Sequence, residues 1–484
     1  MAELAGDTIP AANRDAFLTF GTRMVQELDD RTEWVKWRPQ GTPDYFPERT
    51  GGKAGGRTIA PAIIDGRALG SLRATLRPPS PAMDVRPFII TAEDLGALRM
   101  ITRTNRGRRA ALRVGARTAW GVVARREPLG IGQALCARLR LALRDVGVPV
   151  WLSSPMVEVT RTPHGDGDVV TGVRVRRNGS EILVRAHRGV VLATGGFSRN
   201  EEMRRKYLPT PTSVDWTMAP EEGQNGDGIV AGMEVGAATA LMNRTWGMPV
   251  LIAPIAGKKA PLLTQWERSL PGVMVVDRTG ERYANETLPY EEFWKAMYER
   301  EATNGAAAPS WLIFDHRVKS RYLFMRTLPH VPFPVAYRRA GVLHKAATVD
   351  SLARAIDVPE ATLLCTTAQY NNGIRNGSDE EYGRGESAFA KAMGDRMLQN
   401  PNMAPIDHPP FYAMPLFPGD LSTKGGLVTD DRARVLRADG SVIEGLYATG
   451  NCAAAPATGD SYPGAGATIG SAMVFGYVAA KDMT

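Results

Sequence analysis

Hydrophobic and polar positions follow two different periods along the chain. Near the start, apolar side chains recur every three or four residues from Phe17 to Leu28, which predicts an amphipathic helix within residues 1–40. Downstream the period changes to two, which is typical of strands. The strands that this pattern predicts cover residues 148–153, 157–161, 170–176, 181–187 and 189–193. Asn178-Gly179 predicts a type I′ turn between the third and fourth of them, so the middle three form an antiparallel meander.

The rest of the chain mixes both periods. Helices are predicted over 130–144, after Gly226, near 291–301 and over 350–372, and short strands over 272–277 and 445–449. The uncharged segment 461–480 resembles a membrane span, but Pro463 and several glycines allow a helix to begin only near Gly466. About fifteen helical residues rise roughly 22 Å, less than the ~30 Å core of a bilayer, so a buried helix is predicted.

Composition supports an ordinary globular α/β protein. Of the 484 residues, 43% are hydrophobic and 23% are charged, which excludes extensive disorder. The three cysteines lie far apart without a CxxC pair, so we expect no metal site, no disulfide framework and a reducing compartment. The first residues lack the pattern of a secretory signal, and we therefore expect a cytoplasmic protein.

The net charge of +8 is local. Nine arginines and no acid lie between Asp94 and Glu127, so the remaining chain is nearly neutral. Their spacing predicts two basic helical stripes, formed by Arg99, Arg103 and Arg106 and by Arg109, Arg113 and Arg117. A solvated face and a peripheral membrane contact through Arg99–Arg126 both stay open, and we expect no nucleic-acid partner.

Two predicted strands end in glycine turns, VVLATGG (190–196) and GLYATGN (445–451). Glycine is required where backbone passes close to a pyrophosphate or a flat ring, because a Cβ atom would collide. Each turn alone is unremarkable, but together they indicate one cofactor domain assembled from separated segments. The stretch Gly226–Ala231 matches GxGxxA, yet no strand precedes it, so we interpret it as the start of a helix.

Three blocks resemble the flavoprotein 3-ketosteroid Δ1-dehydrogenases, within the fumarate-reductase-like flavoproteins, and the resemblance covers essentially the whole chain. These blocks are GDLSTKGGLVTDDRARVLRADGSVIEGLYATGN with SYPGAGATIGSAMVFGY, ERYANETLPYEEFWKAMY (281–298) and PDYFPERTGGKAGGRT (43–58). The resemblance implies an α/β fold with an incomplete Rossmann-like FAD-binding domain and an inserted α+β catalytic domain. The expected boundaries are 1–250 with 424–484 for the first, including an arginine-rich insertion at about 75–128, and 251–423 for the second.

Members of this family begin with a strand, GxGxxG and a helix, and this sequence starts beyond that segment. We therefore expect either a longer native protein or a truncated chain that does not retain flavin. The resemblance implies FAD-dependent 1,2-desaturation of a 3-ketosteroid, with hydride passing from C1 to flavin N5 and electrons leaving to an external acceptor. A related flavoprotein acting on another ketone or enone, and a non-catalytic remnant, are the alternatives.

The resemblance also implies the site residues. Tyr462 and the backbone N–H of Gly466 would bind the C3 carbonyl oxygen, Tyr290 would take the proton from C2, and Tyr45 would assist it. A free phenol has a pKa near 10, so a tyrosine base needs a neighbour that stabilises its anion. The cofactor-binding residues implied in the same way are Val157, Ala193, Thr194, Gly195, Gly196, Gly450, Asn451, Ala467, Thr468 and Ile469.

Overall fold

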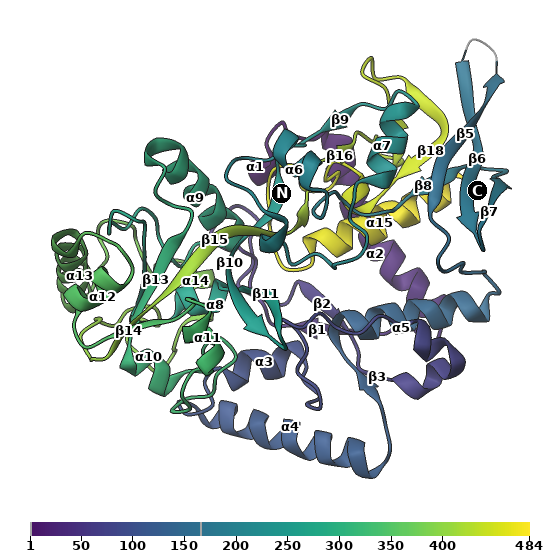
Figure 1. The fold of residues 1–484 in the computed structure, drawn as a ribbon. Coiled ribbons are helices and arrows are strands. Elements are labelled where there is room, and N and C mark those ends of the chain that lie inside the picture. Colours follow the sequence, from purple (N-terminus) through teal and green to yellow (C-terminus); the bar gives the residue numbers. More distant parts are fainter. Residues whose placement is uncertain (1, 165–166) are drawn as a thin grey trace. The chain divides into compact units, whose positions relative to one another are not determined.

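The computed structural model describes residues 2–164 and 167–484, which form two compact units (Figure 1). Unit 1 contains Met1–Trp34, Ala142–Trp246 and Asp420–Thr484, and unit 2 contains Val35–Leu141 and Gly247–Gly419. The α/β fold class is confirmed. Compared with the expected domain boundaries, residues 35–141 and 247–250 lie in unit 2 and residues 420–423 lie in unit 1. Within unit 2, Arg99 stacks on Trp266 at 3.0 Å and Arg103 pairs with Asp395 at 2.8 Å, which ties residues 35–141 to 247–419.

Unit 1 is built on two small sheets. Strand β8 (Val190–Leu192) pairs in parallel with β18 (Val442–Ala448), and β17 (Arg434–Leu436) is antiparallel to β18. The predicted meander is confirmed as β5 (Met156–His164), β6 (Gly167–Arg177) and β7 (Ser180–Arg185). Positive φ angles at Asn178 and Gly179 fit the expected I′ turn between β6 and β7. The strand–glycine–loop segments 190–196 and 442–451 therefore start from adjacent strands.

Helices from the two chain ends pack together in unit 1. Helix α2 (Ala11–Arg31) places Phe17, Phe20 and Met24 against Val474 and Val478 of α15 (Ala467–Asp482). This contact explains the predicted helical period at the start of the chain. The remaining helices of this unit are α1 (Ala2–Ala5), α6 (Glu201–Tyr207) and α7 (Asp227–Glu234), with the short strands β9 (Thr239–Ala240) and β16 (Gly426–Leu427).

Unit 2 contains a six-stranded sheet in the order β11-β10-β15-β13-β12, with β14 also pairing β15. Its strands are β10 (Thr245–Ile255), β11 (Lys258–Leu263), β12 (Val273–Val276), β13 (Ser310–Asp315), β14 (His344–Ala346) and β15 (Phe411–Thr423). Helices α3 (Ala92–Leu98) and α4 (Asn105–Val123) of this unit belong to the arginine-rich segment. The other α-helices of the unit are α5 (Ile131–Asp145, which continues into unit 1), α8 (Gln265–Ser269), α9 (Tyr290–Asn304), α10 (His316–Arg321), α11 (Val335–Arg339), α12 (Val349–Ala355), α13 (Glu360–Arg375) and α14 (Ala388–Met393). Short strands β1 (Trp37–Gln40), β2 (Thr58–Pro61), β3 (Ile64–Asp65) and β4 (Pro128–Leu129) complete it.

Two secondary-structure predictions are wrong. Residues 148–153 have the alternation of a strand, but no strand pairs with them among the described residues, and Trp151 instead stacks on Arg177 at 4.2 Å. The predicted helix over 350–372 is two helices, α12 and α13, because Asp357 has a positive φ and Pro359 begins the second helix. In the described part of the chain, no helix has both the length and the apolar character needed to cross a bilayer.

The arginine-rich segment also differs from its prediction. It forms α3 (Ala92–Leu98) and α4 (Asn105–Val123), so Arg99, Arg103 and Arg106 do not share one helix. Thr104 caps the start of α4, which explains the break. Arg109, Arg113 and Arg117 do share α4, but Arg113 and Arg117 bind buried Asp94 at the start of α3. The exposed arginines of the segment are Arg106, Arg108, Arg109, Arg113, Arg125 and Arg126.

Candidate active site

Tyr45 and Tyr290 form a buried phenol pair in unit 2. The Tyr45 hydroxyl donates a hydrogen bond to the Tyr290 oxygen at 3.1 Å, and the ring centroids lie 5.4 Å apart in an edge-to-face arrangement. Their exposed fractions are 8% and 7%. Phe389 packs on Tyr45 at 4.9 Å and holds its ring in place. A donor aimed at the Tyr290 oxygen favours the anionic form of that phenol, which is the form a base must adopt.

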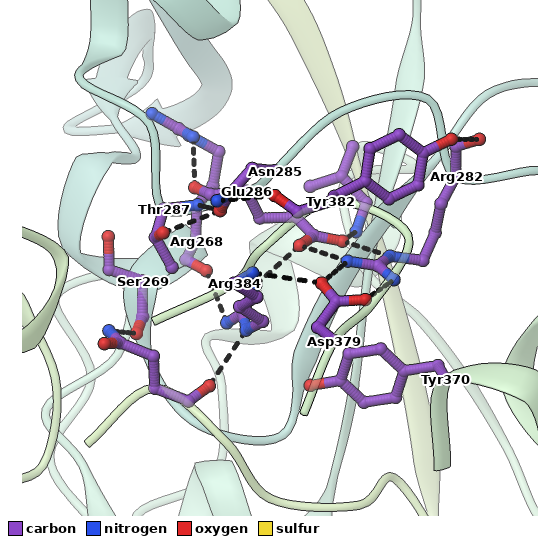
Figure 2. Close-up of polar contacts among 12 residues, drawn as sticks. Arg268, Ser269, Arg282, Asn285, Glu286, Thr287, Tyr370, Asp379, Tyr382 and Arg384 are labelled. Carbon is purple, nitrogen blue, oxygen red and sulfur yellow. Dashed lines mark hydrogen bonds and ion pairs between the residues drawn. The ribbon is translucent and has the colours of Figure 1, made fainter. Parts of the chain in front are cut away.

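Tyr290 is the first residue of α9, and a buried ion network fixes the loop that leads to it (Figure 2). Arg268 donates to the carbonyl oxygens of Glu286 and Leu288, and Gln265 donates to Leu288 at 3.2 Å. The Glu286 carboxylate in turn binds Arg282 at 2.8 Å and Arg384 at 2.7 Å. The backbone before Tyr290 is therefore held at several points by groups that are almost completely buried.

Charge balance explains why this network tolerates burial. Burial alone would raise the pKa of Glu286, but the Arg282 and Arg384 guanidinium groups outweigh it and lower that pKa to about 2. Arg282 also binds Asp379 at 2.8 Å, so Arg282, Arg384 and the two carboxylates each face an opposite charge. Arg268 gains carbonyl partners and the face of Phe293, 4.3 Å away, while burial lowers its pKa to about 9.

Tyr462 and Gly466 belong to unit 1, at the loop that enters α15. Tyr462 is 5% exposed and packs edge-to-face on Trp246, with the ring centroids 5.1 Å apart. The Thr468 hydroxyl donates to the Tyr462 oxygen at 3.4 Å, so this bond does not consume the Tyr462 proton. The indole N–H of Trp246 donates to Asn451 Oδ1 at 2.8 Å, which links the Tyr462 loop to the GLYATGN turn.

The ATGG turn after β8 packs against a segment that sequence reasoning dismissed. Gly196 donates its N–H to Gln224 Oε1 at 3.0 Å, and Gly226 donates to the Gly196 carbonyl at 3.0 Å. Gly195 has a φ of +84°, which favours glycine, and a Cβ atom there would lie 2.2 Å from the Gln224 side-chain nitrogen, so the Gln224 side chain would have to move. The run EEGQNGDG is rich in turn-forming residues, which is the signal that the sequence offers for a loop here, and Gln224 and Gly226 have positive φ angles in the structure. Reading Gly226 as a helix start is confirmed, because it precedes α7.

The predicted cofactor residues of unit 1 can be tested for fit to a flavin. Gly466 has a φ of +84°, open space where a Cβ atom would lie, and no capping side chain within the described residues. The first turn of α15 therefore presents backbone N–H groups and a positive dipole that suit the oxygens of a flavin ring. Ala193 and Thr194 at the end of β8 are exposed, and Val157 lies at a register shift between β5 and β6. The open helix start at Gly466 fits the group, and the contacts of Ala193, Thr194 and Val157 with it stay a prediction.

Comparisons with known proteins identify the family of the chain. Residues 1–469 match the FAD binding domain family. The chain is 39% identical to the 3-oxosteroid 1-dehydrogenase of Mycolicibacterium smegmatis, covering 99% of this chain and 84% of that protein. It is 32% identical to the 4-oxocyclohex-2-ene-1-carboxylate 5-dehydrogenase of Sinomonas cyclohexanicum, covering 100% and 82%. Among solved structures, the Sterolibacterium denitrificans 3-ketosteroid delta1-dehydrogenase in complex with 1,4-androstadiene-3,17-dione matches with a TM-score of 0.92 and 35% identity, over 100% of this chain and 87% of that one.

Proposed function

This chain belongs to the FAD-binding flavoprotein family that contains the 3-oxosteroid 1-dehydrogenases, and we propose that it desaturates the C1–C2 bond of a 3-ketosteroid. Bound FAD supplies the hydride acceptor, and an external acceptor then removes the electrons. The observation that carries the proposal is the buried Tyr45–Tyr290 hydrogen bond, because it supports an anion on the residue expected to act as base.

In this proposal each side chain has one task. The Tyr45 hydroxyl stabilises the phenolate form of Tyr290, and this phenolate takes the proton from C2 and becomes a neutral phenol, while the negative charge passes to the substrate. The Tyr462 hydroxyl and the Gly466 N–H donate to the C3 carbonyl oxygen, which develops negative charge as the proton leaves. Thr468 orients the Tyr462 phenol through their 3.4 Å hydrogen bond. The residues that would contact the flavin are Val157, Ala193–Gly196, Gly450, Asn451 and Ala467–Ile469.

Two substitutions test these roles in the flavin-loaded protein. Tyr290→Phe and Tyr462→Phe should each lower turnover of a 3-ketosteroid by about a hundredfold or more, since each removes one proton-transfer or oxyanion contact. Tyr337→Phe is the matched control, because its buried hydroxyl bonds only weakly to the Met325 carbonyl at 3.5 Å. Turnover at the unmodified rate in either of the first two variants would remove the assignment.

The smaller cyclic ketones are a second candidate substrate class. A relative that matches this chain over its full length is named for a 4-oxocyclohexene carboxylate. The same phenol pair and carbonyl donors would serve that chemistry, because both substrates lose a proton from the carbon beside a ketone. Comparing kcat/KM for a 3-ketosteroid and for 4-oxocyclohexanecarboxylate on one preparation decides between them, and a higher value for the acid would replace the steroid assignment.

We also propose that α4 holds the protein on the inner face of an anionic membrane. Large apolar side chains are exposed along this helix: Leu112 (74%), Trp120 (62%), Val122 (71%) and Val123 (78%). The adjoining loop adds exposed Phe88, and its neighbour Ile89 donates its backbone N–H to Thr118 of α4 at 3.3 Å. Arg108, Arg109, Arg125 and Arg126 are exposed on the same helix and just after it.

Charge favours a lipid surface over a second copy of the chain as the partner of α4. A symmetric dimer through this face would bring the same arginines together, whereas each arginine gains about 1 kcal/mol near an anionic leaflet. Tryptophan at the headgroup level adds apolar anchoring. A steroid substrate also partitions into membranes, so docking would raise its local supply.

Sedimentation with vesicles tests this contact. Full-length protein should bind phosphatidylglycerol vesicles and bind phosphatidylcholine vesicles weakly, and Trp120→Ser with Val123→Ser should abolish binding. Leu364→Ser, which alters another exposed apolar side chain, on α13, is the control. Unchanged binding in the double variant excludes α4 as the anchor. If the unmodified protein sediments as a dimer and the double variant as a monomer, the exposed face of α4 is a self-association surface instead.

A further inference from the structure

Lys424 is a buried cation that the proposed mechanism does not use. It directly follows β15, in the two-residue link 424–425 to β16, and its side chain has no exposed surface. Its ammonium group donates to the carbonyl oxygen of Ser461 at 3.2 Å and lies 4.5 Å from the centre of the Trp246 ring. Burying an ammonium group costs several kcal/mol, so its contacts must compensate.

The two contacts of Lys424 described above both lead to Tyr462. Ser461 directly precedes Tyr462, so the ammonium group fixes the peptide from which the phenol side chain projects. Trp246 is the ring on which Tyr462 packs edge-to-face, so the same ammonium group also holds the surface beneath the phenol. The face of the Trp246 ring lies against the ammonium group, and the indole N–H of Trp246 donates to Asn451 Oδ1.

The two residues before Lys424 contact groups beside the ATGG turn that follows β8. Thr423 Oγ1 accepts the N–H of Phe197 at 2.9 Å, and Ser422 Oγ donates to Gln224 Oε1 at 3.1 Å, next to the ATGG turn. One short segment therefore fixes the predicted cofactor turn through Ser422 and Thr423 and the Tyr462 loop through Lys424. Substituting Lys424 should therefore loosen the Tyr462 loop and leave the ATGG turn in place.

We propose that Lys424 is the positioning residue of Tyr462: its ammonium group, bound to Ser461 and stacked on Trp246, holds the phenol in the orientation that donates to the substrate carbonyl. This inference rests on the proposed function, because it assigns Lys424 to the carbonyl-binding half of that site. Lys424 contacts neither substrate nor flavin in this role. Its loss weakens a hydrogen bond that strengthens in the transition state, and so lowers kcat more than it raises KM.

The test uses the full-length, flavin-loaded protein and compares Lys424→Met with Lys424→Arg. The methionine variant should lower kcat by about tenfold or more with KM changed by less than about threefold, and the arginine variant, which keeps the charge, should recover part of the loss. The carbonyl stretch of a bound 3-ketosteroid labelled with carbon-13 at C3 is the readout independent of turnover. It should move towards its value in water-free solvent in Lys424→Met and less so in Lys424→Arg.

A double-mutant cycle separates this inference from the proposed function. In a Tyr462→Phe background, Lys424→Met should cost nothing further, because Lys424 acts through Tyr462. If the two losses add, or if Lys424→Met leaves kcat and the carbonyl stretch unchanged, Lys424 is not a positioning residue, although Tyr462 keeps its role. Full activity of Tyr462→Phe alone would overturn the role of Tyr462 and this inference with it. Should Lys424→Met fail to fold, Lys424→Gln, which keeps an N–H donor for Ser461, undergoes the same measurements.

Discussion

The Tyr45–Tyr290 pair gives the sharpest prediction, because Tyr45→Phe deletes one hydroxyl and keeps the ring. The ring still packs on Phe389 and on Tyr290, at centroid distances of 4.9 and 5.4 Å, so the phenol geometry is preserved. What is lost is the hydrogen bond to the Tyr290 oxygen, 3.1 Å long between two buried groups. A hydrogen bond to a charged partner contributes about 1.5–3 kcal/mol, so ionising Tyr290 becomes harder by that amount.

This free energy converts directly into kinetics. At about 1.4 kcal/mol for each factor of ten, kcat/KM at neutral pH should fall roughly 10- to 150-fold in Tyr45→Phe. The sign follows from the charge: the base works only when ionised, so the rising acidic limb of the pH profile should move about one to two pH units higher. Activity should then recover as the pH is raised.

The assay is kcat/KM for a 3-ketosteroid with an artificial electron acceptor, measured from roughly pH 6 to pH 10. Tyr337→Phe, another buried phenol of unit 2, should leave the profile unchanged. An unshifted acidic limb in Tyr45→Phe would refute the reasoning, and so would a loss of rate that is constant across the whole pH range, because neither fits a donor that stabilises the base.

Three further predictions concern the surrounding structure. Glu286→Gln should lower the free energy of unfolding by about 3–5 kcal/mol in urea titrations near neutral pH, because it leaves buried guanidinium groups uncompensated, whereas exposed Glu380→Gln should not. Since the pKa of Glu286 falls from 4.5 to about 2 on folding, the unmodified protein should lose stability as the pH drops through that window, and the glutamine variant should lack this loss. Asp94→Asn should speed hydrogen exchange throughout α3 and α4, because Asp94 both caps α3 and binds two arginines of α4; exchange confined to residues near 94 would contradict this. Thr468→Val should reduce turnover by only about fivefold, as expected for one neutral hydrogen bond, and a hundredfold loss would mean a direct role for its hydroxyl.

Local patterns predicted most strands and several helices, because their causes lie within a few residues. The meander follows from alternation and from Asn178-Gly179, and the start of α15 follows from Pro463 and the glycines around it. The break between α3 and α4 was also readable, since Thr91 with Asp94 and then Thr104 are capping residues. The regular spacing of the arginines across this break suggested one continuous helical stripe instead.

Features that depend on distant partners were not predictable. The arginines of α4 were counted between Asp94 and Glu127 as an acid-free run, yet Asp94, at its boundary, binds two of them. Residues 148–153 have the sequence of a strand but no strand beside them in the described part of the chain. Gln224 lies 28 residues from the Gly196 N–H that it binds, and no periodicity marks such a contact. The importance of Lys424 likewise depends on Ser461 and Trp246, which only the fold brings together.

The pairing of α2 with α15 has a consequence for synthesis. The apolar face of α2, with Phe17, Phe20 and Met24, packs on a helix that begins only at Ala467. At translation rates of about 5–20 residues per second, roughly 20–90 s pass between the emergence of the two helices. During that time the apolar face of α2 is exposed to solvent, whereas every segment of unit 2 has been synthesised once the chain reaches residue 419. The nascent chain should therefore complete unit 2 first, and holdase chaperones should bind the apolar face of α2 until α15 has been made.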